Sequence, residues 1–175
     1  MPSHILIPAP DIERRIRELG AEISRDYRDA GDVHLVCVLK GAFLFMADLV
    51  RAIEIPVTMD FMALSSYATG TTTSGEVKLQ KDLDDAIEGR HVLIVEDIVD
   101  TGLTLHYLRE ILTARGPRSV RTVCLLSKPS RRRIDVAVEY IGFTIEDQFV
   151  VGFGLDYAEQ HRNLPHIAVL GKAQG

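Results

Sequence analysis

Three strand-length runs place the strongest constraint on the fold of this 175-residue chain. They are VHLVCVL at 33–39, HVLIVEDI at 91–98 and SVRTVCLLSK at 119–128. Strands that stay apolar for most of their length are typical of a sheet covered on both faces, because neither side of such a strand faces water. A segment with helical character follows each of the first two runs. This alternation predicts an α/β fold with a mostly parallel sheet flanked by helices.

Helices are expected at three places. The first covers residues 12–27, the second is AFLFMADLVRAI at 42–53, and the third follows the turn at 100–102 and stops at Gly116-Pro117. In the first and third segments apolar residues recur every three or four positions, which predicts one buried stripe on each helix. The stripes consist of Ile12, Ile16, Leu19, Ile23 and Tyr27, and of Leu105, Leu108, Ile111 and Leu112.

A long hairpin is expected between residues 57 and 83. VTMDFMALSSY and VKLQKDL, at 57–67 and 77–83, have the composition of two strands. The stretch between them, YATGTTTSGE, consists of small polar residues with almost nothing to bury, which favours a mobile loop. We therefore predict a flexible lid at about 65–77.

The C-terminal part has a different pattern. The runs at 138–145, 149–157 and 167–170 are short and strand-like, and no long helix separates them. We predict that residues from about 129 to 175, together with the N-terminus, form a small hood lobe over the sheet edge. Hydrophobic residues make up 46% of the chain, enough for one core, so residues 1–175 are expected to form a single domain.

Composition argues against several function classes. The formal net charge of −5 argues against a general nucleic-acid binder, because no strong positive field would attract a polyanion. Cys37 and Cys124 lie in apolar runs and are expected to be buried residues rather than a disulfide framework. Residues 1–25 contain no apolar stretch of signal-peptide length, and no run approaches the roughly 20 apolar residues of a membrane span. We expect a cytoplasmic protein without membrane contact.

The run VLIVEDIVDTGLT raises the main chemical question, because a buried strand leads directly into three acids. Glu96, Asp97 and Asp100 would be costly if buried unpaired, so we expect them where the strand emerges, facing water, a cation or a polyol. Ligands of open α/β sheets bind beyond the carboxyl ends of the strands. The turn at 101–104 adds two hydroxyls, a glycine and the free N–H groups of a helix start, which suits a phosphate.

A simpler interpretation is that Asp100 or Thr101 caps the helix while Glu96 and Asp97 are solvated. Each residue taken alone favours that interpretation. The combination favours a ligand site, because most positions of this thirteen-residue pattern then have a physical role. The acids would hold sugar hydroxyls or a divalent cation next to the phosphate.

This run resembles the phosphoribosyl-pyrophosphate (PRPP) signature of the type I phosphoribosyltransferase family, and its third acid is similar to that of the hypoxanthine-guanine branch. Four further segments resemble motifs of that family in the same order: LKGAFLF the pyrophosphate loop, SSYATGTTTSGEVKL the lid, LLSK the purine-contacting strand end, and FVVGFGLDYAEQHRNLPHIAVL the base-stacking and C-terminal segment. The resemblance covers residues 33 to 170. It implies transfer of the phosphoribosyl group of PRPP to N9 of hypoxanthine or guanine, with Mg²⁺ as cofactor and with IMP or GMP and pyrophosphate as products.

The resemblance also implies roles at the strand end. Glu96 and Asp97 would hold the ribose hydroxyls, directly or through Mg²⁺, and Asp100 would be the acid/base partner of the purine N7. The 5′-phosphate would bind at Thr101, Gly102, Leu103 and Thr104. Some relatives carry a basic residue at the position of Leu103, but backbone groups dominate there, so little consequence is expected.

A pyrophosphate site and a lid are implied as well. The pyrophosphate would contact Leu39, Lys40, Gly41 and Arg162. In this family the peptide bond that corresponds to the one between Leu39 and Lys40 is often cis. Ser66 and Tyr67 would belong to a lid that keeps water away from an oxocarbenium-like centre.

The purine site implied by the resemblance lies farther along the chain. Lys128 would point at the purine O6, where adenine carries an amine instead. Phe149 would stack on the base, and the backbone of Val150 would contact the ring edge. Asp156 belongs to the same purine-binding segment and matches a further Mg²⁺ ligand, in addition to Glu96 and Asp97.

Other interpretations stay open. Taken alone, Lys40-Gly41 fits a plain strand exit, Lys128 a surface lysine and Phe149 a core residue. A second functional hypothesis is a PRPP- or nucleotide-sensing regulator of the same fold that binds RNA through the basic stretch KPSRRR, which is more simply a solvated loop or a subunit contact. A phosphoribosyltransferase that prefers xanthine or uracil is the third. The family resemblance further implies a homodimer or homotetramer.

Overall fold

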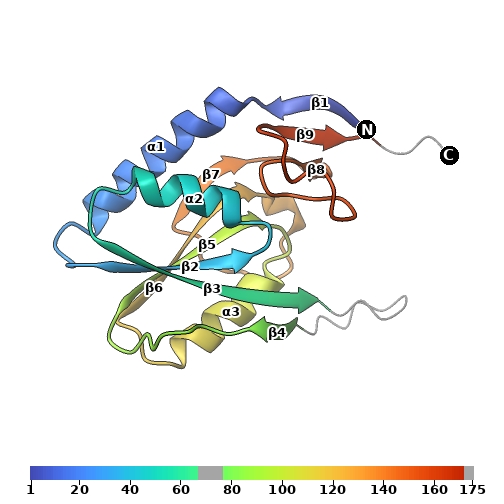
Figure 1. The fold of residues 1–175 in the computed structure, drawn as a ribbon. Helices are drawn as coiled ribbons and strands as arrows, with labels where there is room; N and C mark the ends of the chain where they lie inside the picture. Colours follow the sequence, from blue (N-terminus) through green and yellow to red (C-terminus); the bar gives the residue numbers. More distant parts are fainter. Residues whose placement is uncertain (67–76, 172–175) are drawn as a thin grey trace.

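The computed structural model describes residues 1–66 and 77–171, which form two sheets with helices packed on them (Figure 1). The larger sheet is built from β2 (Val33–Leu39), β3 (Val57–Ser66), β4 (Val77–Lys81), β5 (His91–Val99), β6 (Ser119–Ser127) and β7 (Tyr140–Thr144). Its strand order is β4-β3-β2-β5-β6-β7, and all neighbours pair in parallel except β3 and β4. This architecture confirms the predicted α/β fold with a mostly parallel sheet.

Helices cover both faces of this sheet, as predicted. α1 (Ala9–Asp26) and α2 (Phe43–Ala52) lie on one face, and α3 (Leu103–Thr113) lies on the other (Figure 1). The predicted apolar stripes face the sheet: Ile12, Ile16, Leu19 and Ile23 are buried on α1, and Leu105, Leu108 and Leu112 are buried on α3. Burying one such side chain contributes about 1.5–3 kcal/mol, so each stripe holds its helix against the sheet.

The central strands contribute side chains to both layers of the core, one on each face of the sheet. On β2, Leu35 and Cys37 pack into the cluster under α1 and α2, whereas Val36 and Val38 pack into the cluster under α3. Both cysteines are free and buried, as expected. Burial raises the pKa of Cys37 and of Cys124 to about 12, so each thiol is neutral near pH 7.

A second, antiparallel sheet joins the two ends of the chain. It consists of β1 (Pro2–Ile7), β9 (Ile167–Leu170) and β8 (Val150–Val151), in that order. The prediction that all of residues 129–175 belong to this lobe is wrong for 140–144, because β7 pairs in parallel with β6 in the larger sheet. The connection between β6 and β7 contains only a 3₁₀ turn at Pro129–Arg131 and extended chain, so the helical signal of a parallel crossover is missing.

β3 and β4 form the predicted hairpin. They pair in antiparallel fashion from Ala63 opposite Lys81 to Ser66 opposite Val77. Ser66 is therefore the last residue of β3. Tyr67 and the rest of the predicted lid, up to residue 76, lie outside the described residues.

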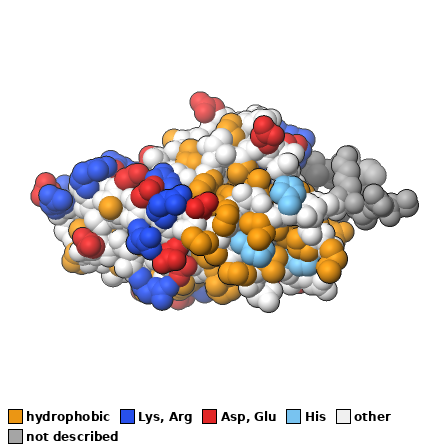
Figure 2. All heavy atoms as spheres, turned by 90° about the horizontal axis from the view of Figure 1, so that it is seen from above, with side chains coloured by type: hydrophobic (Ala, Val, Ile, Leu, Met, Phe, Trp, Pro, Cys, Tyr) orange, Lys and Arg blue, Asp and Glu red, His pale blue; other side chains and the backbone are white. Residues whose placement is uncertain are grey.

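Charged and apolar side chains gather on different parts of one face (Figure 2). Charged groups cover the side of α1, where Arg14 pairs with Asp11 and Arg17 pairs with Glu13. The side of the small sheet is mostly apolar, with histidines among the apolar groups. Within the described ranges, no helix combines the length and the apolar character needed to cross a membrane.

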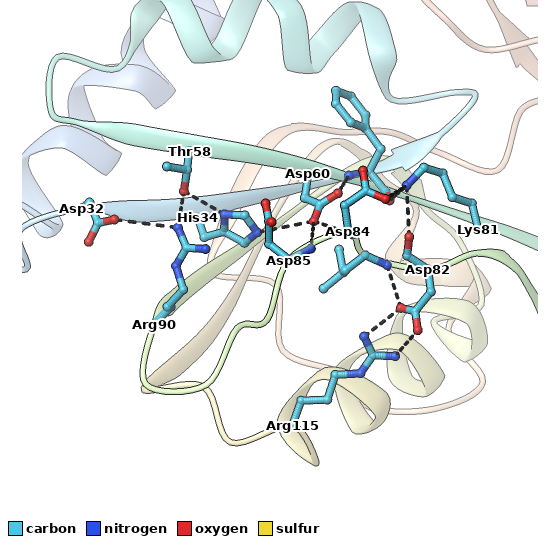
Figure 3. Close-up of polar contacts among 12 residues, drawn as sticks. Asp32, His34, Thr58, Asp60, Lys81, Asp82, Asp84, Asp85, Arg90 and Arg115 are labelled. Carbon is cyan, nitrogen blue, oxygen red and sulfur yellow. Dashed lines mark hydrogen bonds and ion pairs between the residues drawn. The ribbon is translucent and has the colours of Figure 1, made fainter.

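A buried polar cluster lies toward the amino ends of β2 and β3, where the segment joining β4 to β5 packs on the sheet (Figure 3). Asp60 on β3 is only 3% exposed. Its carboxylate accepts hydrogen bonds from the backbone N–H groups of Phe61 at 2.8 Å, Asp84 at 2.9 Å and Asp85 at 3.1 Å. Burial alone would raise the pKa of Asp60, but these bonds lower it. The carboxylate thus anchors the β4–β5 connection to the sheet.

His34 on β2 lies beside this carboxylate with fewer partners (Figure 3). Its Nδ1 lies 2.8 Å from Thr58 Oγ1, which also accepts a hydrogen bond from Arg90 at 2.6 Å. Its Nε2 lies 4.0 Å from Asp60 Oδ2 and has no hydrogen-bond partner among the described residues. Burial, followed by the charge of Arg90, lowers the pKa of His34. The folded protein therefore favours the neutral imidazole.

We expect His34→Gln to reduce the loss of stability on acidification. The unfolded chain protonates His34 near its ordinary pKa of about 6.5, whereas the folded chain resists protonation to a lower pH. Stability of the wild type should therefore fall as the pH decreases from about 6.5 toward the lowered folded-state pKa, and the variant should lack this component. Urea unfolding at a series of pH values checks this, with the exposed His4→Gln as control. Parallel stability curves for wild type and His34→Gln would contradict it.

Candidate active site

Three loops meet at the carboxyl edge of the larger sheet, and two glycines permit their close packing. A Cβ on Gly41, after β2, would lie 1.8 Å from Asp97 Oδ2, at the end of β5. A Cβ on Gly154, after β8, would lie 2.2 Å from the carbonyl oxygen of Gly41. Gly154 also has a φ of +97°, which glycine adopts without strain. The backbone at Gly41 is therefore enclosed between the Asp97 carboxylate and the loop after β8.

The peptide bond between Leu39 and Lys40, in the predicted pyrophosphate loop, is cis. The Lys40 side chain is 68% exposed, and its ammonium lies 3.1 Å from Glu159 Oε2. An exposed ion pair of this kind is weak in water. The ammonium is therefore accessible to an anionic ligand.

Glu96 and Asp97 bring two carboxyl groups together at the end of β5. Glu96 is only 6% exposed. Its carboxyl group therefore does not face open water, which was one of the surroundings expected for it. Burial, and then the charge of Asp97, raises the pKa of Glu96 well above its ordinary range. Burial also raises the pKa of Asp97 to about 6, although a hydrogen bond from the Ile98 N–H at 2.7 Å opposes this. Such a pair favours a bound cation or hydroxyl donors.

The turn after β5 leaves a helix start open. Gly102 is the N-cap of α3, and no side chain in the described part of the chain caps this helix. The His106 N–H donates to the Gly102 carbonyl at 2.9 Å, so the N–H groups of residues 103–105 have no partner within the helix. Thr101 Oγ1 lies 3.4 Å from the Leu103 nitrogen, at the long limit for a hydrogen bond. Asp100 therefore does not cap α3, and Thr101 makes only this one long contact with its first turn.

A cavity of about 200 Å³ lies at this strand end. It is lined by Glu96, Asp97, Ile98, Val99, Asp100, Thr101, Gly102, Thr104 and Leu105. Leu103, predicted with this turn, is not in the lining and is partly exposed. A larger hollow, of about 690 Å³, lies beside α1 and α2, but its lining holds none of these residues. We assign the site to the smaller cavity because the chemically active groups line it.

Asp100 contacts the basic stretch KPSRRR. Its Oδ1 accepts a hydrogen bond from Arg131 Nε at 3.0 Å. Arg132 donates to the carbonyl oxygens of Val99 and Asp100, each at 2.7 Å, and to Ser127 Oγ at 2.9 Å. Both arginines therefore support the strand end, in addition to lying in a largely exposed stretch.

The predicted purine-binding residues lie on two segments near this edge. Lys128 directly follows β6, is 6% exposed, and has its ammonium 3.8 Å from Asp147 Oδ1. Phe149 is 53% exposed, so it is not a core residue, and its ring meets that of Tyr157 edge-on at 5.7 Å between centroids. Val150 is buried in β8. Lys128 thus offers a hydrogen-bond donor and Phe149 an exposed stacking face.

Arg162 joins the remaining acids of the site. Its guanidinium donates to the Gly154 carbonyl at 2.7 Å and lies 3.4 Å from Asp156 and 3.2 Å from Glu159. Its Nε has no hydrogen-bond partner in the described structure. The charge of Arg162 also favours the ionised form of Asp97. Arg162 therefore balances acids on two different loops.

The structure does not gather the predicted Mg²⁺ ligands Glu96, Asp97 and Asp156 into one cluster. Over residues 1–66 and 77–171, no group of three or more His, Cys, Asp or Glu side chains is arranged to hold a metal ion. The charge of Asp156 does act on Asp97 and raises its pKa. A magnesium ion at this edge would need further oxygen ligands, and the oxygens of a substrate can supply them.

Sequence reasoning missed three contributors to this site. Glu159 pairs with both Lys40 and Arg162, and no local pattern in the sequence pointed to it. Arg131 and Asp147 contact each other at 3.7 Å. The alternation of basic KPSRRR with acidic IED was the only available signal for that contact.

Known proteins resemble this chain over almost its entire length. The sequence profile of the phosphoribosyl transferase domain matches residues 5–158. The hypoxanthine phosphoribosyltransferase of Haemophilus influenzae is 53% identical over 165 residues, which cover 93% of this chain and 92% of that protein. The hypoxanthine-guanine phosphoribosyltransferase of Bacillus subtilis is 50% identical over 169 residues, covering 97% and 93%. A crystal structure of a hypoxanthine-guanine phosphoribosyltransferase from Bacillus anthracis has a TM-score of 0.93 at 44% identity, covering 98% of this chain and 100% of that chain.

We expect Gly41→Ala to weaken PRPP binding without unfolding the protein. The added methyl group would collide with the Asp97 carboxylate and push the loop after β2 away from β5. Affinity for PRPP should fall by at least about tenfold, which is roughly 1.4 kcal/mol. Titration calorimetry measures this, and Gly171→Ala is the control, because its added Cβ would make only an ordinary contact, 3.5 Å from Ser3. Unchanged PRPP affinity in Gly41→Ala would contradict the close packing.

Proposed function

The chain belongs to the phosphoribosyl transferase domain family, and we propose that it transfers the phosphoribosyl group of PRPP to N9 of hypoxanthine and guanine. The products would be pyrophosphate and IMP or GMP, so the enzyme would act in purine salvage. Relatives that share about half of their residues with this chain are named for hypoxanthine, or for hypoxanthine and guanine. These names support the choice of substrates.

One observation carries the proposal: β5 delivers the buried Glu96 and the partly buried Asp97 to a helix start whose N-cap residue, Gly102, has no side-chain cap, in the same cavity. The free N–H groups at the start of α3 attract a phosphate. The neighbouring acids suit sugar hydroxyls or a cation and would repel a second free phosphate. A ligand with a phosphate next to ribose hydroxyls, such as PRPP, can bind both the start of α3 and the neighbouring acids.

In the proposed reaction, purine N9 forms a bond to C1′ of PRPP while the bond from C1′ to pyrophosphate breaks. Glu96 and Asp97 would orient the ribose through its hydroxyls, and the turn at 101–104 would hold the 5′-phosphate. Asp100 would take the proton from purine N7 as N9 reacts. Pyrophosphate would leave toward the accessible ammonium of Lys40 and the guanidinium of Arg162.

The purine would be selected at its O6. The ammonium of Lys128 can donate a hydrogen bond to a carbonyl oxygen but cannot accept one from an amine, so adenine would leave it unsatisfied. Phe149 would stack on the base, which its exposed ring allows, and the backbone of Val150 would contact the ring edge.

Magnesium is part of the proposal. Glu96, Asp97 and Asp156 would hold it together with oxygens of PRPP, and the weakly compensated charge of the buried acid pair fits a cation. When bound, the ion would neutralise charge on the departing pyrophosphate.

We further propose a homodimer or homotetramer in the cytoplasm. The apolar surface on the side of the small sheet (Figure 2), with Ile5 54% exposed on the edge strand β1, supports contact between copies. Two free, buried thiols fit a reducing compartment.

The contacts of the basic stretch favour the enzyme over the RNA-binding regulator. A surface that binds RNA needs cations free to contact phosphates. Arg132 uses its donors on the strand end, and Arg131 is paired with the carboxylates of Asp100 and Asp147. A preference for xanthine or uracil depends on the pocket shape around residues 149–155 and is decided by the experiment that follows.

The proposal is tested by measuring nucleotide formation from PRPP and Mg²⁺ with hypoxanthine, guanine, xanthine, adenine and uracil in parallel. We expect product from hypoxanthine and guanine and none from adenine or uracil, because only a 6-oxopurine presents both an O6 acceptor and an N7. Product from uracil or xanthine alone would move the assignment to the corresponding transferase. No product with any base, together with clear PRPP or nucleotide binding, would instead favour the regulator.

We expect Asp100→Ala to lower kcat by about 10²- to 10⁴-fold, the usual contribution of a general base. PRPP binding should stay largely intact, because Asp100 is proposed to act on the purine. Steady-state kinetics with hypoxanthine and calorimetric titration with PRPP separate the two effects. Asp135→Ala, at an exposed position, is the control for the lost charge. Loss of PRPP binding with normal turnover of the bound fraction would rule out the general-base role.

A further inference from the structure

A row of alternating charges connects the two ends of the proposed purine site. Lys128 Nζ lies 3.8 Å from Asp147 Oδ1, and Arg131 Nη1 lies 3.7 Å from Asp147 Oδ2. Arg131 Nε then donates to Asp100 Oδ1 at 3.0 Å. Lys128 and Asp100 are the residues proposed to contact O6 and N7 of the base. Asp147 and Arg131 have no proposed contact with any substrate, yet in the described structure they connect the side chains of those two groups.

Asp147 and Arg131 each contact two partners, through different atoms of the side chain. Asp147 offers one carboxylate oxygen to Lys128 and the other to Arg131, and Arg131 offers Nη1 to Asp147 and Nε to Asp100. At the end of the row, Asp100 is held through Oδ1, while its Oδ2 accepts no hydrogen bond from the described residues. The row therefore fixes the Asp100 carboxylate by one oxygen and leaves the other available to receive a proton.

The fold does not depend on this row. The side chains of Arg131 and Asp147 are 47% and 53% exposed, and exposed ion pairs add little to stability. Backbone contacts hold the segment independently, since the Lys128 N–H donates to the Val99 carbonyl at 3.0 Å and Arg132 donates to the carbonyl oxygens of Val99 and Asp100. What Arg131 and Asp147 determine is the direction of the side chains at the two ends.

We propose that Arg131 and Asp147 are positioning residues that set the separation and direction of Lys128 and Asp100, so that one purine pose satisfies both. A 6-oxopurine then accepts at O6 from one end of the row and gives its N7 proton to the other end. Adenine can use only one end, so the row also contributes to discrimination between purines. This inference rests on the proposed function.

The test compares Arg131→Gln, Asp147→Asn and the double variant with two matched controls, Arg133→Gln and Glu146→Gln. Each control removes the same charge from an exposed neighbour whose side chain has no ion pair in the described structure. Hypoxanthine, adenine and PRPP are varied separately in steady-state assays of the full chain, and the thermal unfolding of every variant is recorded.

We expect Arg131→Gln and Asp147→Asn to lower kcat/KM for hypoxanthine by about tenfold or more, with KM for PRPP changed by less than about twofold. The hypoxanthine preference over adenine should fall in both. The double variant should lose little more than the worse single variant, because the two residues act as one bridge. Arg131→Lys and Asp147→Glu, which keep the charges, should recover part of the rate, and unfolding temperatures should match the wild type.

Wild-type kinetics in Arg131→Gln and Asp147→Asn would overturn the inference, and so would losses equal to those of Arg133→Gln and Glu146→Gln. Losses that appear in KM for PRPP instead would point to a general disturbance of the strand end and would also overturn it. Failure of the proposed function looks different: the wild type would then form no nucleotide from hypoxanthine or guanine, before any variant is compared.

Discussion

The cost of keeping two carboxyl groups out of water at the end of β5 is the constraint on which the rest of the site depends. Burial raises the pKa of both Glu96 and Asp97, so their ionised forms destabilise the folded chain at a pH above the raised values, near 6 for Asp97. A ligand that binds the ionised pair stabilises the folded state and so offsets this destabilisation. The surrounding loops are packed to keep the acids in place, since Gly41 lies directly against the Asp97 carboxylate and Gly154 lies against Gly41.

A second buried acid in the same sheet shows that this cost is not imposed by the fold. Asp60, toward the amino ends of the strands, accepts three backbone N–H groups, and its pKa is lowered in spite of its burial. Asp97 accepts a hydrogen bond from the Ile98 N–H, but burial outweighs its backbone hydrogen bonds and the pKa is raised. Backbone N–H groups therefore stabilise the charge of Asp60 at one edge, whereas the charge of Asp97 at the other edge is left for a ligand. That difference, rather than acidity as such, distinguishes the functional edge from the structural one.

Local sequence patterns predict much of the fold and the turn of the candidate site. The buried strands, the stripes of α1 and α3, the hairpin of β3 and β4 and the turn at 101–104 each depend on residues close together in the chain. The errors involve distant contacts. The crossover from β6 to β7 lacks a helix, so the local pattern at 140–144 does not distinguish a strand of the larger sheet from one of the small lobe. Arg131 and Asp100 are 31 positions apart, and Lys40 and Glu159 are 119 positions apart. Helix or strand periodicity in the sequence therefore predicts neither pair.

α3 connects the turn at 101–104 to the base of the β3–β4 hairpin. Thr104 and Leu105 of its first turn line the cavity, and their N–H groups have no partner within the helix. Just beyond its other end, Arg115 holds Asp82 through two parallel hydrogen bonds of 2.7 and 2.9 Å, immediately after β4. A bidentate pair of this geometry fixes direction as well as distance. The base of the β3–β4 hairpin is thus held beside the same helix whose first turn lines the cavity.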